Sequence, residues 1–328
     1  MRERNVILDI MKGIGIILMV AGHSGCPTIL VNFLGTFHMP LFFMISGWLI
    51  SGNSPHILKR IKALYYPFLF WGIIALILQY PLYEIGIYSK PYDYYDYFTH
   101  FIHIITFAQS EPITGPLWFL KSLFFSYIFV SIIVWKIKSK KKNYIIGIFC
   151  FLMLCLGYML YKHNGWLFYN IQRELMMPWL LWLGYYIRNR NIKLQQSPIL
   201  VILCILFLTV AGQYESLDLA GSKIGNPLIL TIYSIIGFTI TYNIANYLNQ
   251  KPAKLTIILA YIGRNTMPIL ILHLISIKII QIAMDLCNIN VDLSQILMYS
   301  DPYWLLYSIA GVTIPLLLNQ LYNISIQK

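Results

Sequence analysis

Charged residues are scarce in this sequence. Only 11% of its 328 residues are Asp, Glu, Lys or Arg, while 58% are hydrophobic, and the mean hydropathy is +0.66. A soluble domain carries charge on about a quarter of its residues, so this composition excludes one. Apolar runs of about twenty residues recur along the chain, which is the length that a helix needs to cross a bilayer. The sequence therefore predicts an integral membrane protein.

Cysteine is also rare, and its five copies are spread singly, mostly through apolar runs. There is no Cys-x-x-Cys pair or Cys/His spacing, so we expect neither a metal site nor a disulfide framework. The first apolar stretch lacks a small-residue cleavage site and is expected to be a span, not a signal peptide. Because no long polar segment interrupts the chain, residues 1–328 are predicted to form a single transmembrane domain.

The apolar runs predict an all-α, polytopic membrane bundle of about ten transmembrane helices. We expect segment 83–114 to lie outside, either at the interface or folded over the bundle, and 252–264 to be a short cytoplasmic helix. The expected spans are 6–25, 30–50, 64–82, 115–135, 144–161, 166–187, 197–212, 226–247, 265–284 and 303–323.

Positive charge is divided unevenly between the connecting segments. One set of segments holds sixteen basic residues, and the other holds only Lys90, Lys162 and Lys223. By the positive-inside rule, both termini are predicted to be cytoplasmic. The same division explains the net charge of +12, so no nucleic-acid partner is predicted. The sixteen are Arg2, Arg4, Lys59, Arg60, Lys62, Lys136, Lys138, Lys140, Lys141, Lys142, Arg188, Arg190, Lys193, Lys251, Lys254 and Lys328.

Some charges remain within the predicted spans or at their ends. A charge in hydrocarbon costs several kcal/mol unless it faces a cavity or a partner, so each of these residues is a candidate for function. The cations are Lys12, Lys121, Arg173, Arg264 and Lys278, and the acids are Asp9 and Glu174.

The first span, "DIMKGIGIILMVAGHSG" (residues 9–25), carries a cation and an imidazole eleven positions apart. Eleven residues at about 100° each return within roughly 20° of the starting direction and rise about 16 Å, so Lys12 and His23 share one helix face. Asp9 lies one turn before Lys12 and can neutralise it. The alternative is that Lys12 snorkels to the cytoplasmic interface and His23 marks the outer one.

A second histidine follows in "FHMPLFFMISG", which places His38 in the outer half of the second span. Pro40 follows it and removes a backbone hydrogen bond. Histidines in the outer halves of consecutive spans can lie within reach of each other. A lone buried histidine is more often a satisfied structural residue, but two histidines with an aligned cation favour a site.

"LDIMKGIGIILMVAGH" and "FHMPLFFMISGWL" together resemble the start of the membrane-bound acyltransferase 3 family, whose first helix carries an Arg/Lys-x10-His pattern that Lys12 and His23 match. "GPLWFLKSLFF" (115–125) and "IGRNTMPILILHLI" (262–275) are similar to later family segments. Within the family, the pattern is most similar to the fucose 4-O-acetylase-like branch of carbohydrate O-acetyltransferases. The resemblance implies a ten-helix membrane enzyme that transfers acetyl groups from cytoplasmic acetyl-CoA to glycan hydroxyls.

The chain departs from the family at one motif. Many members carry Arg-x-x-Arg at the cytoplasmic side of the third helix, where this chain reads "LKRIKALYYP", with Lys59, Arg60 and Lys62. Lysine lacks the bidentate fork of arginine. These residues either bind the coenzyme phosphates or form an ordinary positive-inside cluster. Arg264, after Gly263, either reaches the same phosphates or anchors its helix.

Acetyl transfer to a sugar needs a group that takes the hydroxyl proton. We expect His23 to be this general base, or to carry the acyl group transiently. His38 is expected to orient His23 or the substrate. Lys12, Ser46 and Trp118 are candidate donors to the developing oxyanion, and Lys12 alternatively guides the pantetheine arm.

Arg173 and Glu174 are adjacent in "NIQRELMMPW". Because adjacent helical residues do not face each other, we expect them to have separate partners. They either line the acceptor cavity or form a structural ion pair with Lys121 or another helix. Trp118 either stacks on a sugar ring or is an interfacial tryptophan.

Three further histidines are weaker candidates. For His273, on the ninth span, structural packing is preferred to a role in the site. His100 and His103 share a helix face in the outer segment, but no third ligand accompanies them, so no metal is predicted.

The leading hypothesis is an O-acyltransferase of the bacterial cytoplasmic membrane that acetylates a cell-surface polysaccharide, a lipopolysaccharide sugar or a lipid-linked precursor. The bilayer and the glycan are its expected partners, and acetyl-CoA is its expected co-substrate. A transporter or flippase for a glycolipid or small acid is the runner-up, because it would also explain charges inside the membrane. A structural or sensory protein with incidental histidines is the third hypothesis. The acceptor sugar, the length of the acyl group and the oligomeric state stay open.

Overall fold

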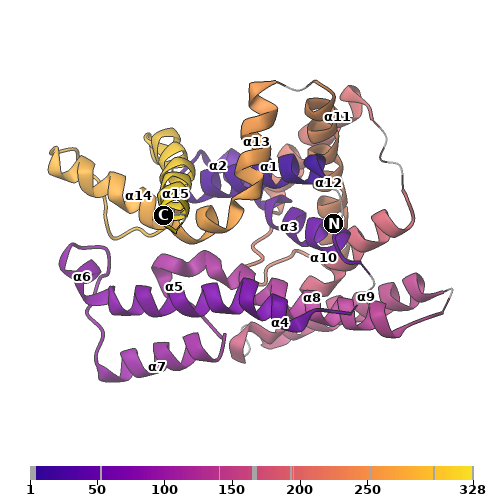
Figure 1. The fold of residues 1–328 in the computed structure, drawn as a ribbon, viewed down its shortest axis with the longest axis horizontal. Helices are drawn as coiled ribbons and strands as arrows, with labels where there is room; N and C mark the ends of the chain where they lie inside the picture. The colour runs from indigo at the N-terminus through magenta and orange to yellow at the C-terminus, as the bar shows by residue number, and fades with distance from the viewer. Residues whose placement is uncertain are drawn as a thin grey trace. The chain divides into compact units, whose positions relative to one another are not determined.

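The computed structural model describes residues 5–51, 54–139, 141–164, 168–192, 194, 196–251, 253–297 and 300–326. The structure is 78% helical and, over these ranges, contains no β-strand (Figure 1). The predicted all-α class is therefore confirmed. Five basic residues that were assigned to the cytoplasmic side lie outside the described residues: Arg2, Arg4, Lys140, Lys193 and Lys328.

Within the described ranges, eight stretches are long and apolar enough to cross a bilayer. They are Val6–His23 (α1); Thr28–Trp48, made of α2 (Thr28–Gly35) and α3 (His38–Trp48); Ile57–Ile77, made of α4 (Ile57–Arg60), the π-helical η1 (Ile61–Tyr65) and α5 (Tyr66–Ile77); Pro112–Lys136, made of the 3-10 turn η2 (Pro112–Leu117) and α8 (Trp118–Lys136); Lys142–His163 in α9 (Lys142–Asn164); Pro227–Gln250 (α12); Thr266–Leu286 (α14); and Trp304–Ser325 in α15 (Trp304–Ile326).

The other two predicted spans also form helices, but each falls short of these criteria. α11 (Pro198–Tyr214) has only 17 residues. α10 (Ile171–Asn189) has 19 residues and contains Arg173, Glu174 and Arg188. The start of that predicted span, 166–167, lies outside the described residues. Of the ten predicted spans, eight thus correspond to helical stretches that are long and apolar enough to cross a bilayer, and two correspond to helices that are too short or too charged.

Four shorter helices occupy the connecting segments: α6 (Gln79–Glu84), α7 (Tyr94–Ile105), η3 (Phe168–Asn170) and α13 (Lys254–Arg264). α7 lies in the predicted outer segment. It starts at a capping box, in which the Asp93 side chain accepts from the backbone N–H of Asp96 at 2.7 Å and the Asp96 side chain accepts from that of Asp93 at 3.4 Å. These bonds satisfy donors that a helix start leaves without partners. α13 is the short helix expected within 252–264.

The second predicted span is interrupted between Gly35 and His38. Pro40 lies in the first turn of α3, where its missing N–H would have no intrahelical partner in any case. The chain therefore begins a new helix just before the proline. The carbonyl oxygen of Leu34 accepts a hydrogen bond from Nδ1 of His38 at 2.6 Å. A side chain thus supplies a donor at the end of α2.

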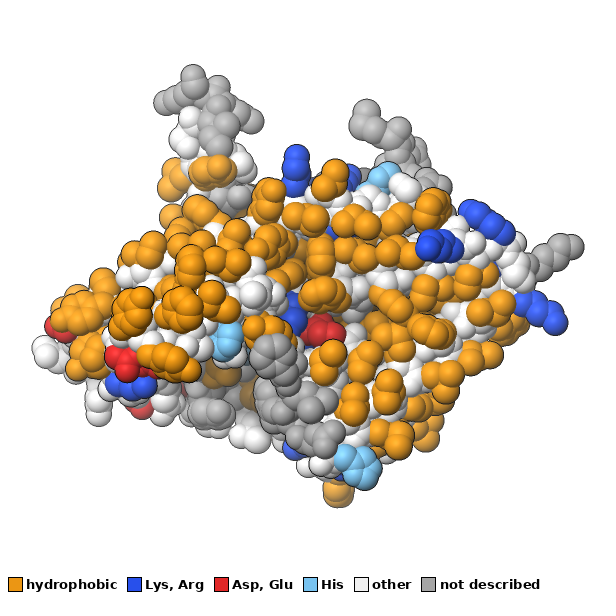
Figure 2. All heavy atoms as spheres, turned by 90° about the horizontal axis from the view of Figure 1, so that it is seen from below, with side chains coloured by type: hydrophobic (Ala, Val, Ile, Leu, Met, Phe, Trp, Pro, Cys, Tyr) orange, Lys and Arg blue, Asp and Glu red, His pale blue; other side chains and the backbone are white. Residues whose placement is uncertain are grey.

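The helices gather into two compact units, each assembled from three separate stretches of chain. The first unit comprises Met1–Gly15, Ile29–Ile61 and Ser122–Arg264, and the second comprises Ile16–Thr28, Lys62–Lys121 and Asn265–Lys328. α1 contributes to both units. Hydrophobic side chains cover most of the face seen in Figure 2, with few charged groups among them. Such a surface suits helices that are surrounded by lipid.

Glycines set the helix packing in the first unit, where α10 lies against α3 and α9. A Cβ atom added at Gly47 of α3 would collide with the carbonyl of Leu181, and one added at Gly184 of α10 would collide with that of Met44. The two backbones therefore touch at reciprocal positions. Small residues permit such close approach in membranes, where van der Waals packing drives helix association.

Aliphatic and aromatic side chains form the core of the second unit. α14 and α15 lie side by side there, and α5 lies beside α7 (Figure 1). Leu274 and Ile277 of α14 and Tyr307 of α15 are at most 1% exposed and pack with residues of segment 83–114. This core fixes the position of α14, which carries His273.

Candidate active site

His23, the last residue of α1, lies against His273 of α14 in the second unit. Nδ1 of His23 and Nε2 of His273 are 2.9 Å apart. The two rings stack, with centroids 5.1 Å apart and 18° between their planes. His273 is 0% exposed, whereas His23 is half-buried. The imidazole that contacts His23 therefore comes from the ninth predicted span, from a residue for which the sequence favoured simple packing.

Backbone carbonyls determine which nitrogens of this pair carry protons. Nδ1 of His273 lies 2.9 Å from the carbonyl oxygen of Ile269 and 3.1 Å from that of Leu270. A carbonyl oxygen only accepts, so Nδ1 of the neutral His273 ring holds the proton and Nε2 holds the lone pair. Nδ1 of His23 must then donate to that Nε2. A neutral His23 consequently has its lone pair on Nε2.

Lys12 pairs with Asp9, as the sequence predicted. Nζ of Lys12 lies 3.1 Å from Oδ1 of Asp9, and the two side chains are 23% and 5% exposed. α1 is an unbroken helix from Val6 to His23. The prediction that Lys12 and His23 share one helix face depends on this continuity. The cation is thus neutralised locally while part of its side chain remains accessible.

α13 crosses α1 at this ion pair, within the first unit. A Cβ atom at Gly263 would collide with the carbonyl of Asp9, and one at Gly13 would collide with that of Leu259. Arg264 follows Gly263, ends α13 and is exposed. The structure therefore brings the helix turn of Lys12 and the end of α13 together, although the two are far apart in sequence.

The basic residues at the start of the third span differ in their surroundings. Lys59 and Lys62 are exposed. The guanidinium of Arg60 lies 3.6 Å from the centroid of the Tyr127 ring, and its buried Nε has no hydrogen-bond partner among the described residues. A cation over an aromatic face is stabilised in place. Lys59 and Lys62 are therefore the more accessible contacts for a phosphate group.

Two other cations within the spans donate to backbone carbonyls of neighbouring segments. Nζ of Lys121 donates to Ala108 at 3.2 Å. Nζ of Lys278 donates to Leu293 at 2.7 Å and to Gln295 at 2.6 Å. Both lysines are at most 4% exposed. These contacts suit residues that hold the loops 106–111 and 287–297 against the helices.

Arg173 and Glu174 have separate partners, as the sequence predicted, but they also pair with each other. Nη2 of Arg173 lies 3.0 Å from Oε1 of Glu174, because the arginine side chain is long enough to curve around the start of α10. Nη1 of Arg173 also donates to the carbonyl of Ala220 at 2.9 Å, and the hydroxyl of Ser122 donates to Oε1 of Glu174 at 3.0 Å. Arg173 is 2% exposed. These contacts tie the start of α10 to Ser122 of α8 and to the main chain at Ala220.

The remaining predicted residues make local contacts. Nδ1 of His38 donates to Leu34 in the neighbouring helix turn, and the hydroxyl of Ser46 donates to the carbonyl of Phe42 at 2.8 Å. Trp118 begins α8 and meets the ring of Phe119 edge-on. Ser46 uses its hydroxyl proton within α3, which makes it a poorer oxyanion donor than the sequence suggested.

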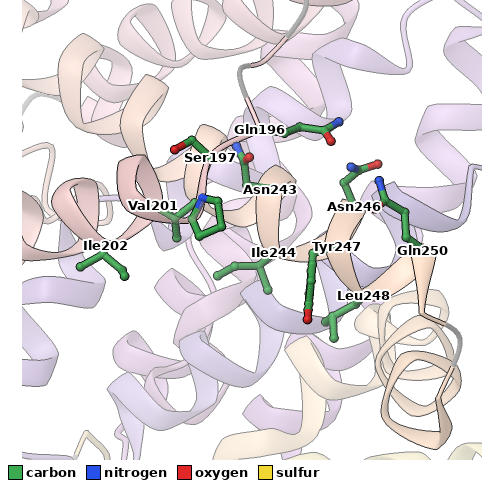
Figure 3. A pocket seen from close by; sticks show the side chains of 11 residues that line it. Gln196, Ser197, Val201, Ile202, Asn243, Ile244, Asn246, Tyr247, Leu248 and Gln250 are labelled. Atoms are coloured by element: carbon green, nitrogen blue, oxygen red, sulfur yellow. The ribbon is translucent and has the colours of Figure 1, made fainter.

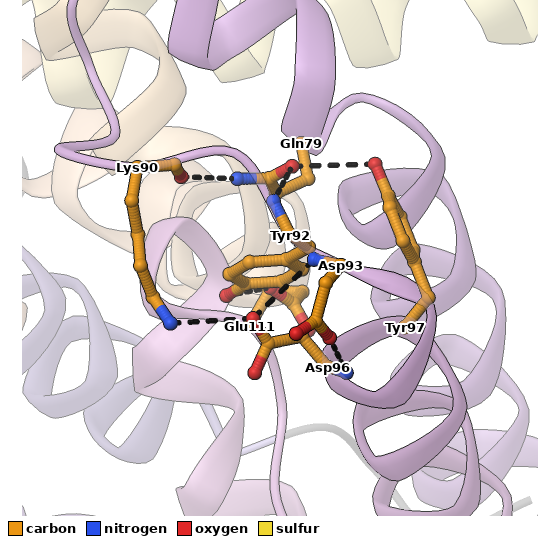
Figure 4. Close-up of polar contacts among 7 residues, drawn as sticks. All are labelled: Gln79, Lys90, Tyr92, Asp93, Asp96, Tyr97 and Glu111. Atoms are coloured by element: carbon orange, nitrogen blue, oxygen red, sulfur yellow. Dashed lines mark hydrogen bonds and ion pairs between the residues drawn. The ribbon is translucent and has the colours of Figure 1, made fainter.

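A buried polar cluster ties α6, α7 and the start of η2 together (Figure 4). Glu111 is 0% exposed and accepts from Nδ1 of His100 at 2.6 Å and from the hydroxyl of Tyr92 at 3.0 Å. Oε1 of Gln79 accepts from the hydroxyl of Tyr97 at 3.2 Å. The described residues contain no group of three or more His, Cys, Asp or Glu side chains that could hold a metal. The contacts in this cluster indicate a structural role.

The His100–Glu111 pair should make thermal stability depend on pH. The hydrogen bond to Glu111 raises the pKa of His100 above its ordinary value, although burial opposes this. The stabilisation is therefore complete below the ordinary pKa of about 6.5 and is lost as pH rises through the higher folded-state pKa. We expect the Tm of the His100 protein to fall relative to that of His100→Gln as pH rises.

His103 titrates in the opposite sense, because burial lowers its pKa. Both proteins should therefore carry His103→Gln, and their Tm values should be measured in detergent from about pH 5 to about pH 9. A difference in Tm that stays constant over this range would contradict the prediction.

Comparison with known proteins gave one match. A family model described as an acyltransferase domain matches residues 5–320. No curated protein and no solved structure matches the chain. The matched range includes both members of the His23–His273 pair and every site residue that the sequence predicted.

Proposed function

The chain belongs to the acyltransferase 3 family and is a membrane acyltransferase, and on that premise we propose that it transfers an acetyl group from cytoplasmic acetyl-CoA to a sugar hydroxyl. The acceptor is a cell-surface glycan or its lipid-linked precursor. The likeness of the first two spans to the fucose 4-O-acetylase-like branch supports a carbohydrate acceptor. The charge distribution predicts that the His23 end of α1 is outside, and this supports an acceptor at the outer face.

The hydrogen bond between His23 and His273 carries the proposal. A sugar hydroxyl must lose its proton as its oxygen attacks the thioester carbonyl carbon. Nε2 of His23 accepts that proton, the new ester C–O bond forms, and the C–S bond breaks. The departing sulfur then takes the proton back from His23, so the enzyme is regenerated. His273 touches neither substrate in this scheme and acts as a positioning residue.

His273 supports this chemistry in two ways. It fixes the lone pair of His23 on Nε2, and its own Nε2 accepts from Nδ1 of His23 while that ring is positively charged. The anchoring bonds to Ile269 and Leu270 keep the His273 ring from rotating. A base with a fixed tautomer is available in every encounter with the acceptor.

The coenzyme is proposed to be held at the cytoplasmic end through its phosphates. Lys59, Lys62 and Arg264 suit this role because they are exposed and basic. Arg60 contributes positive charge from its place over Tyr127. Lys12 either donates to the oxyanion or guides the pantetheine arm, with Asp9 holding its ammonium group.

Substitution of His273 tests the positioning role. We expect His273→Leu to lower kcat by at least about 10²-fold with little change in KM, because the tautomer of His23 is no longer fixed. His273→Gln keeps an acceptor oxygen and should recover part of the loss. The pH dependence of kcat should shift in both variants. If both variants instead raised KM to the same extent and left the pH profile of kcat unchanged, His273 would be a purely structural residue.

The activity itself is tested by glycan mass spectrometry of a deletion strain, which should lose one acetyl increment from a surface glycan. Purified protein should also transfer labelled acetyl from acetyl-CoA to that glycan or its precursor. Uptake of a glycolipid or small acid into vesicles without consumption of acetyl-CoA would favour a transporter instead.

A further inference from the structure

A cavity of about 570 Å³ lies in the first unit between the start of α11 and the last turns of α12 (Figure 3). This volume is in the range of small-molecule sites. None of the predicted site residues is among the described residues that line it. The cavity is therefore separate from the residues proposed to react.

The described lining is mostly apolar, with several polar side chains and no charged one. Gln196, Asn243, Asn246 and Gln250 present carboxamides to it, and no Asp, Glu, Lys, Arg or His is among the described lining residues (Figure 3). A carboxamide both donates and accepts hydrogen bonds. Enclosing an ion without a partner is costly. The enclosed part of a ligand must therefore be neutral, apolar over most of its surface, and hydroxyl- or amide-bearing where it meets the carboxamides.

Two polar residues of the lining, Asn243 and Ser197, are held in place by their helices. Asn243 is 7% exposed, and its Nδ2 donates to the carbonyl of Thr239 at 2.8 Å. Ser197 caps α11 by accepting from the backbone N–H of Leu200 at 3.3 Å, so its hydroxyl proton is still a donor. Preorganised groups of this kind lower the cost of binding.

A fixed positive charge lies beside the cavity. Nζ of Lys251 donates to the hydroxyl of Tyr247, a lining residue, at 3.2 Å and lies 5.0 Å from the centroid of its ring. A ligand with a neutral body and an anionic group at one end would match this arrangement.

The lengths of the two helices indicate the level of the cavity in the bilayer. With 17 residues, α11 spans about 26 Å, less than the hydrocarbon core of about 30 Å, whereas α12 has 24 residues and spans about 36 Å. α12 therefore extends beyond the hydrocarbon core, and Lys251 at its end favours the headgroup region for its last turns. Ile202 and Tyr247 line the cavity and are 57% and 56% exposed. The cavity is thus open to lipid, which favours a ligand from the bilayer over a soluble one.

We propose that this cavity binds an anionic phospholipid whose headgroup carries hydroxyls, as phosphatidylglycerol does. The headgroup hydroxyls bond to the carboxamides and Ser197, and the phosphodiester lies next to Lys251. The upper part of an acyl chain lies along Val201, Ile202 and Ile244, which form the apolar wall. This site is independent of acyl transfer.

Native mass spectrometry of the full chain in detergent, titrated with phosphatidylglycerol or phosphatidylcholine, tests the proposal. The wild type should bind phosphatidylglycerol preferentially. Lys251→Ala should weaken that binding about fivefold, as expected for one basic residue near a membrane surface. Lys251→Arg should retain it, and Lys138→Ala, an exposed lysine away from the cavity, should leave it unchanged.

Val201→Trp gives a second readout, because it fills the cavity without altering charge, and it should remove the preferred lipid. Equal binding of the two lipids, or wild-type binding by both Lys251→Ala and Val201→Trp, would overturn the proposal. Displacement of phosphatidylglycerol by coenzyme A or by inorganic phosphate would also overturn it, in favour of a soluble phosphate ligand.

Discussion

Replacement of His23 by alanine is expected to reduce acetyl transfer by about 10²- to 10⁴-fold, the contribution usual for a general base. The reason is that Nδ1 of His23 donates to His273, which leaves the lone pair of the neutral His23 ring on Nε2. KM for acetyl-CoA should change little, because His23 is not among the residues proposed to bind the coenzyme phosphates. The rate should be measured with labelled acetyl-CoA on purified protein.

His163→Ala is a matched control, because His163 is exposed at the end of α9. It should retain wild-type activity, and both variants should be inserted at wild-type levels. Full activity in His23→Ala would remove His23 from the mechanism. Acid quenching during turnover separates the two roles: an acetyl group found on the His23 peptide would identify an acyl carrier, and its absence would support direct base catalysis.

The second large effect is expected from Gly263→Ala. The added Cβ would overlap the backbone of Asp9, and a backbone atom cannot move aside as a flexible side chain can. Overpacking of this kind costs about 1–3 kcal/mol, and a backbone obstruction belongs at the upper end. The Tm in detergent and the yield of folded protein should both fall.

Gly115→Ala is the control for this substitution, because a Cβ at Gly115 has no described neighbour within 4 Å. Its Tm should match the wild type. The part of Gly263→Ala that folds should also lose activity, since displacement of α13 disturbs the Lys12–Asp9 pair. A wild-type Tm for Gly263→Ala would show that α13 does not pack on α1 as described.

Much of the fold was predictable because each span satisfies its own backbone hydrogen bonds. Hydropathy and length locate such helices without knowledge of their neighbours, which is why α1, α12, α14 and α15 lie close to their predicted bounds. The Lys12–Asp9 pair was predictable for a similar reason, since both residues lie within one turn. Local sequence was less informative around Pro40, where one span was predicted and the structure has two helices, α2 and α3.

The partner of His23 could not be predicted, because 250 residues separate the two histidines. Helix periodicity gives the direction of a side chain on its own helix but not which helix it will meet. His273 in "LILHLI" therefore looked like a packing residue. The direct contact between Arg173 and Glu174 was missed for a different reason: helix periodicity describes the directions of Cβ atoms, and a long guanidinium side chain reaches beyond them.

The proton on His273 is placed by main-chain oxygens at positions 269 and 270. Every amino acid brings the same oxygen, so exchange of either residue leaves the direction of proton donation between the rings intact. Substitutions at positions 269 and 270 are thus compatible with the same chemistry as long as α14 stays helical. Only positions 273 and 23 require a particular side chain for this proton donation.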